Sequence, residues 1–262
     1  MSIHPTAIVS ERAKIAADAE IGPYCVIEGE VEIGSQTVIE SHVRIGSRFG
    51  RVTIGSQNHI LAGAAIGGPP QDLTYKSGAY TALTIGSHNR IGEFVTIHIG
   101  TAKGGGVTRI GDHCFIMTHA HVAHDCQVGD HVIMVNSAQI GGHVIVEHHA
   151  VVGGCAIVTQ LNRVGAYSFM AVGAMANKDL LPYSIIEGHW AAPRALNRVG
   201  LKRAGIDAAE RRNIDKALRL LLQRSLTVEE ALARIEGECE PSPQIAHLLQ
   251  FVRGSERGIA RG

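Results

Sequence analysis

Isoleucine, valine or methionine recurs at nearly every sixth residue between Ile3 and Met170 of this 262-residue chain. A period of six fits neither the two-residue alternation of a strand nor the 3.6-residue turn of a helix. It indicates a solenoid in which each hexad contributes one short strand and one corner, and three hexads complete a triangular coil. The chain is therefore predicted to be mainly β, with parallel strands stacked about 4.8 Å apart and the branched residues pointing inward.

Glycine frequently follows the branched residue of a hexad. We interpret this glycine as a corner residue, because glycine adopts dihedral angles that other residues disfavour. The same glycines exclude an amphipathic helix, since each one would cost about 1 kcal/mol inside a helix. They are Gly22, Gly34, Gly46, Gly55, Gly86, Gly92, Gly111, Gly129, Gly141, Gly153 and Gly165.

The composition narrows the functional class. Lys plus Arg and Asp plus Glu each number 24, so the charge balance does not indicate a nucleic-acid-binding protein. We expect no membrane span and no signal peptide, because no long apolar run and no basic-then-apolar leader occurs. Five cysteines are scattered along the chain, and Cys25, Cys114 and Cys126 fall on the fifth position of a hexad. They predict small core residues in a reducing, cytoplasmic protein rather than a disulfide or metal framework.

Three insertions interrupt the hexads. Three extra residues lie near Arg51, thirteen span 72–84 and seven span 103–109. A solenoid corner needs no such excursion, and long loops of this kind are often binding elements. We interpret them as candidate binding loops, with tolerated surface insertions as the alternative.

The hexads fade between residues 177 and 188. The pattern predicts a hexapeptide-repeat β-helix over 1–188 and a small helical domain over 189–262. Nine Lys or Arg residues from 194 to 224 face only three acidic residues and predict a basic surface for an acidic partner, with a solvated helix face as the alternative. Helix starts are predicted from Asp207 with Glu210, Thr227 with Glu230, and Ser242 with Pro243.

A cluster of histidines lies between residues 119 and 124. His124 is the third residue of its hexad and is predicted to point away from the core. Adding eighteen residues for each coil places Gly142 over His124, and Gln160 over Gly142. His143 is placed over Asp125 in the same way. One outer strip would thus present an imidazole, a backbone amide without a side chain, and a carboxamide.

This strip suits acyl transfer. Histidine takes protons from hydroxyls or amines near neutral pH, and an adjacent Asp125 would orient the ring. The Gly142 amide would face a developing oxyanion. Direct transfer is favoured over a covalent intermediate, because Cys126 is predicted to point inward and no other nucleophile adjoins the strip. The alternative to a catalytic strip is that these histidines cluster by chance, since the chain contains 15 histidines.

A metal site is a competing interpretation. His119 and His124 are five residues apart and His98 is placed one coil below, and zinc binds three converging imidazoles at about 2 Å. Gamma-type carbonic anhydrases are similar solenoids that bind metal in this manner. Such a metal-dependent hydratase would need neither the long loop at 72–84 nor the basic tail. A third interpretation is a non-catalytic scaffold whose tail binds a partner.

A set of short motifs occurs in a characteristic order along essentially the whole chain. The motifs are His4-Pro5-Thr6-Ala7, Pro70-Gln71-Asp72-Leu73, Thr96-Ile97-His98, Gly100-Thr101, His121-Val122-Ala123-His124-Asp125-Cys126, Gly142-His143 and Gly200-Leu201-Lys202-Arg203. With them the chain closely resembles the UDP-N-acetylglucosamine 3-O-acyltransferases, which begin lipid A synthesis in Gram-negative bacteria. Each motif alone is weak, whereas the ordered set is specific.

The resemblance implies a left-handed parallel β-helix with a small C-terminal α-helical domain. It implies a homotrimer with active sites between subunits. The donor would be a 3-hydroxyacyl chain on the phosphopantetheine of acyl carrier protein, an acidic partner that suits the basic tail. The acceptor would be the glucosamine 3-hydroxyl of UDP-N-acetylglucosamine. No metal and no bound cofactor are expected.

By position, the resemblance makes His124 the general base, Asp125 its supporting carboxylate and Gly142 the oxyanion donor. Asn197 and Arg203 would hold the nucleotide and its phosphates, for which the planar guanidinium of arginine is suited. The sugar and acyl site would be lined by Asp72, Leu73, His98, His121, His143 and Gln160.

The resemblance also places Val172 at the far end of the acyl pocket. Many members of the family carry glycine at this position. A valine fills the space of a terminal methylene, and bulk at a pocket end discriminates by about 1–3 kcal/mol for each methylene. We therefore expect a shorter acyl chain than in the glycine-bearing members.

Several residues depart from the family pattern near the expected substrate contacts, while the base, its carboxylate and the glycine are kept. The family usually has Lys where this chain has Thr74, and Lys76 lies two residues on. An altered acceptor, such as the 3-amino sugar, or another nucleotide sugar is an alternative, but we favour drift with the usual substrate. The other departures are Ile99, Thr159, Val199 and Ala204.

Overall fold

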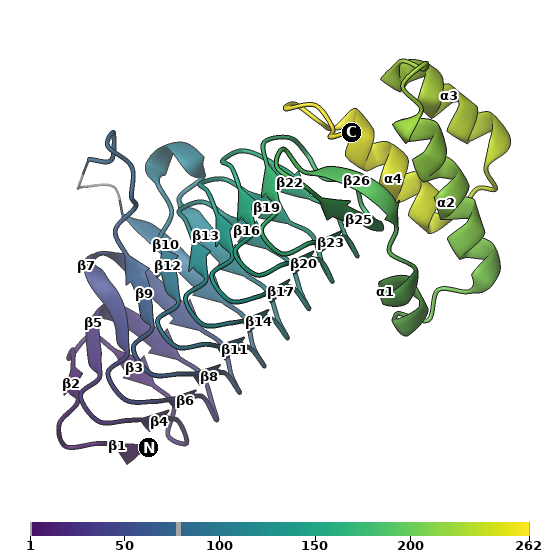
Figure 1. Ribbon diagram of the computed structural model, residues 1–262. Coiled ribbons are helices and arrows are strands. Elements are labelled where there is room, and N and C mark those ends of the chain that lie inside the picture. The colour runs from purple at the N-terminus through teal and green to yellow at the C-terminus, as the bar shows by residue number, and fades with distance from the viewer. Residues whose placement is uncertain (1, 77–79, 262) are drawn as a thin grey trace.

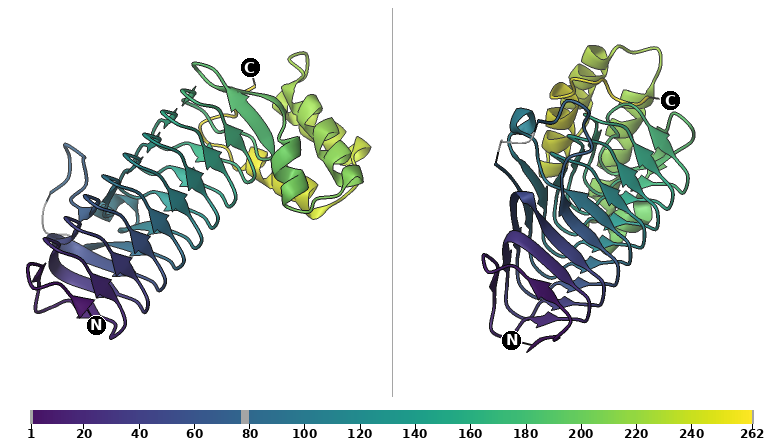
Figure 2. Two further views of the ribbon diagram at one scale, coloured as in Figure 1. Left: turned by 60° about the horizontal axis from the view of Figure 1, so that its bottom comes forward. Right: turned by 90° about the vertical axis from the view of Figure 1, so that its left-hand side faces the viewer.

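The computed structural model describes residues 2–76 and 80–261 as a three-sided solenoid that ends in a group of helices (Figure 1). The N-terminus lies at one end of the solenoid and the helices lie at the other (Figure 2). Residues 77–79 of the long insertion are outside the described residues. The arrangement confirms the prediction of stacked hexads that form a mainly β, parallel β-helix.

The first face of the solenoid carries strands that pair in parallel from coil to coil. The exception is the last pair, which is antiparallel. In spatial order the strands are β1 (Ser2–Ile3), β4 (Glu20–Ile21), β6 (Val38–Ile39), β8 (His59–Ile60), β11 (Arg90–Ile91), β14 (Phe115–Ile116), β17 (Ile133–Met134), β20 (Val151–Val152), β23 (Phe169–Met170), β25 (Ser184–Glu187) and β26 (Ala192–Leu196).

The second and third faces share two long strands, β5 (Val26–Ile33) and β7 (Arg44–Ile54), which pair on both faces. The second face continues with β2 (Ile8–Val9), β9 (Ala65–Gly68), β12 (Thr96–His98), β15 (His121–Val122), β18 (Gln139–Ile140), β21 (Ile157–Val158) and β24 (Met175–Ala176). The third face continues with β3 (Lys14–Ile15), β10 (Thr81–Ile85), β13 (Val107–Ile110), β16 (Gln127–Val128), β19 (Ile145–Val146) and β22 (Arg163–Val164).

The branched residue of each hexad fills the interior, as predicted. Ile116, Val122, Met134 and Ile140 have no exposed surface, and they stack on their counterparts one coil away. Aliphatic burial of this kind stabilises by about 25 cal/mol for each Å² removed from water. The interior column therefore sets the eighteen-residue register that aligns outward-facing residues.

The glycines at the second hexad position have a different role from the one expected. Among those named above, Gly46 alone has a positive φ. The others lie against the backbone of the next coil: a Cβ on Gly92 would lie 2.6 Å from the Thr118 nitrogen, and one on Gly165 would lie 2.4 Å from the Pro182 nitrogen. Close coil stacking, and not corner dihedrals, requires glycine there.

The corner dihedrals are adopted by the fourth residue of the hexad, which is rarely glycine. A left-handed conformation costs an ordinary residue about 1–2 kcal/mol, and the stacking of every coil on the next offsets this cost. The residues with φ between 54° and 65° are Tyr24, Gln36, His42, Gln57, His88, Phe94, His113, His119, Asp125, His131, Ser137, His143, His149, Cys155, Leu161, Tyr167 and Tyr183.

The C-terminal region has its own apolar core, formed by the four helices with residues of the last coil. β26 pairs with β25 across residue 188, so the sheet continues through the predicted domain boundary, and the division stays a prediction. No helix among the described residues is long and apolar enough to cross a membrane. The helices are α1 (Arg198–Arg203), α2 (Ala208–Leu222), α3 (Val228–Glu238) and α4 (Pro243–Arg253).

The predicted helix starts are observed, with one difference. Thr227 and Glu230 form a complete capping box at α3, and Ser242 caps α4. Asp207 caps α2 through its side chain. The Glu210 side chain instead accepts a hydrogen bond from the Ser242 hydroxyl at 2.6 Å, and so ties the start of α2 to the start of α4.

The cysteines agree with the predicted core role at the fifth hexad position. Cys25, Cys114 and Cys126 are buried, and all five cysteines are free. Burial raises the pKa of the Cys126 thiol to about 12, so this thiol is not a nucleophile near neutral pH.

Replacing a second-position glycine tests the close stacking of coils. A Cβ on Gly34 would lie 2.6 Å from the carbonyl carbon of Gly55, so Gly34→Ala is expected to lower the melting temperature in a thermal scan. Gly237→Ala is the matched control: no atom lies within 4 Å of its Cβ, and alanine in a helix stabilises by about 0.5–1 kcal/mol. Equal melting temperatures for the two variants would contradict this explanation.

Candidate active site

The corner between the second and third faces carries the expected strip. β15 pairs with β18, and β18 pairs with β21, at steps of eighteen residues, so His124, Gly142 and Gln160 follow one another along this corner. A Cβ on Gly142 would lie 2.7 Å from His124 Cε1 and 2.8 Å from Nε2. The predicted stack is confirmed, and the Nε2 edge of the imidazole faces a position that only glycine leaves open.

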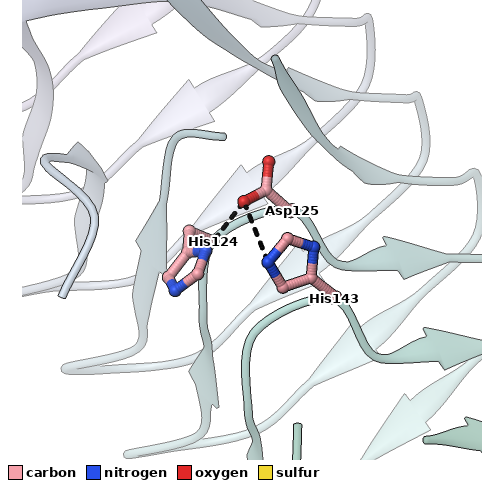
Figure 3. Close-up of side chains that lie close together, drawn as sticks. All are labelled: His124, Asp125 and His143. Carbon is pink, nitrogen blue, oxygen red and sulfur yellow. Dashed lines mark hydrogen bonds and ion pairs between the residues drawn. The ribbon is translucent and has the colours of Figure 1, made fainter. Parts of the chain in front are cut away.

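His124 is held by the next residue in the chain (Figure 3). Its Nδ1 lies 2.8 Å from Asp125 Oδ2, and the two side chains are 12% and 0% exposed. A carboxylate accepts a hydrogen bond, so Nδ1 carries the proton and Nε2 has a free lone pair. The ring is thus oriented with its basic nitrogen toward Gly142.

Asp125 is held in turn by Thr101 and Gly104, which lie just before and at the start of the third insertion. The Thr101 amide donates to Oδ1 and the Thr101 hydroxyl donates to Oδ2, each at 2.7 Å. Gly104 packs so closely that a Cβ there would lie 2.1 Å from the Asp125 carboxyl carbon. Burial alone would raise the pKa of Asp125, but hydrogen bonds from His124 and Thr101 outweigh burial and lower it.

Sequence reasoning did not identify Thr101 and Gly104 as parts of the site. The sequence nevertheless carried a signal for Thr101. The coil that contains the insertion has the usual eighteen residues plus the seven inserted ones, so Thr101 is placed beside Cys126, one residue from Asp125. The insertion is therefore more than a tolerated surface loop, since its Gly104 packs on the Asp125 carboxyl group. Thr101, just before the insertion, supplies two of the three hydrogen bonds to that carboxylate among the described residues.

His143 lies on the other side of the carboxylate. Its Nε2 is 3.7 Å from Asp125 Oδ2, and its ring is perpendicular to that of His124, with the centroids 5.3 Å apart. Within the described residues, these three side chains form the one group whose ligand atoms lie close enough together to hold a metal, within 4.8 Å.

The metal interpretation from the sequence required His98, His119 and His124 to converge. They do not: His119 lies at the preceding corner, where its ring stacks on Phe94 with the centroids 5.2 Å apart. Because a corner turn separates His119 from His124, the two imidazoles project from different edges of the second face.

His98 and His121 form a neutral wall beside the strip. His98 Nδ1 donates to the Pro69 carbonyl at 2.6 Å, and His121 Nδ1 lies 2.7 Å from the Thr96 hydroxyl. Burial, followed by the nearby His98 and His124, lowers the pKa of His121 to about 4. Burial also lowers the pKa of His98. Both rings are therefore neutral near pH 7.

The second insertion brings Asp72 near the corner. Asp72 accepts hydrogen bonds from the Thr74 amide at 2.7 Å and the Thr74 hydroxyl at 3.0 Å. These bonds are the main cause of its lowered pKa, and the charges of His124 and Lys103 contribute. Leu73, the neighbouring predicted site residue, is fully exposed.

Asn197 precedes α1 and Arg203 ends it. α1 lies beyond the last coil, apart from the coils that carry the histidine strip of the same chain (Figure 1). Asn197 caps α1 by accepting from the Gly200 amide, and it donates to the Tyr167 carbonyl, so its contact with a nucleotide stays a prediction. Arg203 is exposed and lines a cavity of about 840 Å³ together with Arg198, Lys202, Arg211 and Arg212.

Val172 is 77% exposed and lies at the corner where the second face begins. The His124 strip lies at the corner where that face ends. Between the two corners, the outer surface of β18, β21 and β24 presents Gln139, Ile157 and Met175.

Comparison with known proteins agrees with this geometry. The family model for bacterial transferase hexapeptide repeats matches residues 3–47 and 108–138. The model described as UDP-N-acetylglucosamine O-acyltransferase, domain 2, matches residues 179–260. The solenoid thus matches the hexapeptide-repeat transferases, and the helical C-terminal region matches the model of one acyltransferase family.

Full-length relatives define the family more closely. Proteins named acyl-[acyl-carrier-protein]–UDP-N-acetylglucosamine O-acyltransferase from Xanthomonas campestris and Myxococcus xanthus are 46% and 44% identical, covering 99% of this chain and 97% and 99% of theirs. The solved UDP-N-acetylglucosamine acyltransferase of Francisella novicida is 37% identical, with a TM-score of 0.95 over 99% of this chain and 94% of that one. The chain belongs to this acyltransferase family.

Acid is expected to destabilise the fold through the half-buried His98 and His121. The pKa values of His98 and His121 are lowered in the folded state, so the unfolded chain binds more protons below its ordinary histidine pKa of about 6.5. The free energy of unfolding should therefore fall as the pH drops from about 6.5 toward 4. Denaturant titrations at several pH values would measure the slope, and His121→Asn should flatten it. An unchanged slope in that variant would contradict the assignment.

Proposed function

We propose that this chain transfers a 3-hydroxyacyl group from acyl carrier protein to the glucosamine 3-hydroxyl of UDP-N-acetylglucosamine, the first step of lipid A synthesis. The observation that carries the proposal is the buried Asp125–His124 pair, whose free nitrogen faces the exposed edge of Gly142. The substrates follow from the names of the full-length relatives.

In the proposed reaction, His124 Nε2 accepts the proton of the sugar 3-hydroxyl while that oxygen attacks the thioester carbonyl carbon. The resulting oxyanion is stabilised by the Gly142 amide, which donates to no protein backbone acceptor among the described residues. The carbon–sulfur bond then breaks, and the His124 imidazolium returns the proton to the departing thiolate. The products are an ester and the free phosphopantetheine thiol.

Asp125 is proposed to remain a carboxylate throughout. Its hydrogen bonds to Thr101 and His124 hold its pKa below the usual range, so it stabilises the transient imidazolium without taking its proton. The activated acyl group arrives as a thioester, and the proposed chemistry therefore needs no metal and no bound cofactor. The five free cysteines agree with a cytoplasmic location.

A homotrimer is proposed: the number of three subunits rests on the family resemblance, and the need for more than one chain is supported by the incomplete site of a single chain. Arg203 lies apart from His124 in one chain, and Leu73 projects fully exposed, so a neighbouring copy is needed to bring such residues together. The outer side of the first face also carries a row of partly exposed apolar residues, which is typical of an interface. The row is Phe115, Ile133, Val151 and Phe169.

The acyl chain is proposed to lie across the second face, over Ile157 and Met175, from the His124 corner toward Val172. The basic cavity on α1 and α2 is proposed to receive acidic or phosphate groups, with Arg203 placed for bidentate contact. His98, His121, His143 and Gln160 would line the sugar.

Removing the base tests the proposal directly. We expect His124→Ala to lower kcat by about 10²- to 10⁴-fold, the usual contribution of a positioned general base. Transfer from 3-hydroxyacyl carrier proteins to UDP-N-acetylglucosamine, followed by mass spectrometry, measures it, and His4→Ala in the first coil is the control. Full activity in His124→Ala would refute the role, and transfer only to the 3-amino sugar would identify an altered acceptor.

The Val172 position is expected to set acyl length. Val172→Gly removes an exposed isopropyl group from the corner and should shift the preferred acyl chain to a longer one by about one or two methylenes. Competition among carrier proteins loaded with different chain lengths gives the preference. An unchanged optimum in a variant of normal melting temperature would place the end of the acyl pocket elsewhere.

A further inference from the structure

A cavity beside the catalytic corner lies between the second insertion and residues 101–103, where the third insertion begins. Its volume is about 410 Å³, within the range of small-molecule sites. Asp72, Thr74, Tyr75 and Lys76 line it from one loop, and Thr101, Ala102 and Lys103 line it from the other. Because Thr101 also holds Asp125, one wall of this cavity belongs to the catalytic machinery.

Lys103 is the cation of the shorter loop. It belongs to a single turn of 3-10 helix, η1 (Ala102–Gly104), which Thr101 caps. Gly104 packs on the carboxyl group of Asp125. Lys103 thus lies between Thr101 and Gly104, which both contact Asp125. These contacts fix the backbone of Lys103 relative to the His124–Asp125 pair.

The ammonium of Lys103 is directed across the cavity to the other loop. Its Nζ donates to the Thr74 hydroxyl at 3.3 Å. Thr74 in turn donates to Asp72, whose pKa is lowered mainly by these Thr74 bonds and further by the charges of His124 and Lys103. The Lys103 ammonium therefore lies close to Asp72 through the Thr74 hydroxyl.

The charge of Lys103 is not neutralised by a direct ion pair. Within residues 2–76 and 80–261, no carboxylate oxygen lies within 4.0 Å of its Nζ. An ammonium held by one neutral hydroxyl at the mouth of a cavity keeps two donors free for an anionic oxygen of a ligand.

We propose that Lys103 is a substrate-binding residue that donates to a phosphate oxygen of one of the two substrates. The inference rests on the proposed function, in which both substrates carry phosphate: the diphosphate of the nucleotide sugar and the phosphodiester of phosphopantetheine. Lys103 and Thr74 line the same cavity from opposite loops and are in contact. We therefore expect a lysine at position 74 to direct its ammonium into this cavity and to replace the cation of Lys103.

The test measures kcat and the KM of each substrate for wild type, Lys103→Gln and the double variant Lys103→Gln/Thr74→Lys. We expect Lys103→Gln to raise one KM by about tenfold or more, as for the loss of a charge-assisted hydrogen bond, with little change in kcat. A rise for the nucleotide sugar assigns the diphosphate, and a rise for the acyl carrier protein assigns the phosphodiester. The double variant should recover most of the loss.

The control is Lys14→Gln, an exposed lysine in the first coil, whose kinetic constants should match those of wild type. A lowered kcat with both KM values unchanged would overturn the inference, because Lys103 would then act through Asp125. Failure of Thr74→Lys to recover any of the loss would overturn the interchange of the two positions.

Direct binding separates this inference from the proposed function. Dissociation constants for UDP-N-acetylglucosamine and for phosphopantetheine, measured calorimetrically with the full chain, need no turnover. One of them should rise in Lys103→Gln and be more weakly salt-dependent than in wild type. Equal constants in both proteins overturn the role of Lys103. Binding without any acyl transfer in wild type would instead refute the proposed function.

Discussion

The stacking of each coil on the next is the constraint on which the site depends. Parallel pairing at eighteen-residue steps places His124 under Gly142, although the two are distant in sequence. The second-position glycines lie against the backbone of the next coil at distances that a Cβ would prevent. A looser stack would separate the imidazole from the amide that faces the reacting carbonyl.

Under this constraint, Asp125 is the most heavily restrained polar group of the site. A buried carboxylate is unstable unless donors surround it, because burial removes its hydration. The Thr101 amide, the Thr101 hydroxyl and His124 supply those donors, and Thr108 accepts from the Asp125 amide. The same bonds that make burial tolerable also fix the tautomer of the imidazole, so stability and chemistry rest on one set of contacts.

Periodicity and local caps were sufficient to predict the inward residues, the His124 strip and the helix starts at Thr227 and Ser242. The structure confirms all of these features, because each depends only on spacing along the chain. The close packing of the second-position glycines was missed, because it depends on how nearly two backbones approach and not on local dihedral preference.

The insertions were beyond sequence reasoning for a related reason. The coil register places Thr101 beside Cys126, but it does not show that Thr101 donates to Asp125. Within the insertions the hexad phase is interrupted, so no register shows that Lys103 reaches Thr74. The sequence shows that Thr74 departs from the family pattern. That Lys103 of another loop contributes a cation there can be inferred only from the three-dimensional arrangement of the two loops.

The most direct test of the proposed catalytic role of His124 is a crystal structure of the protein with the acceptor sugar nucleotide bound. We predict that the sugar 3-hydroxyl lies within about 3.2 Å of His124 Nε2, the reach required of a general base. We also predict that the acyl carbonyl oxygen of a product complex lies on the Gly142 amide. A sugar bound with its 3-hydroxyl directed away from His124 would contradict the central claim.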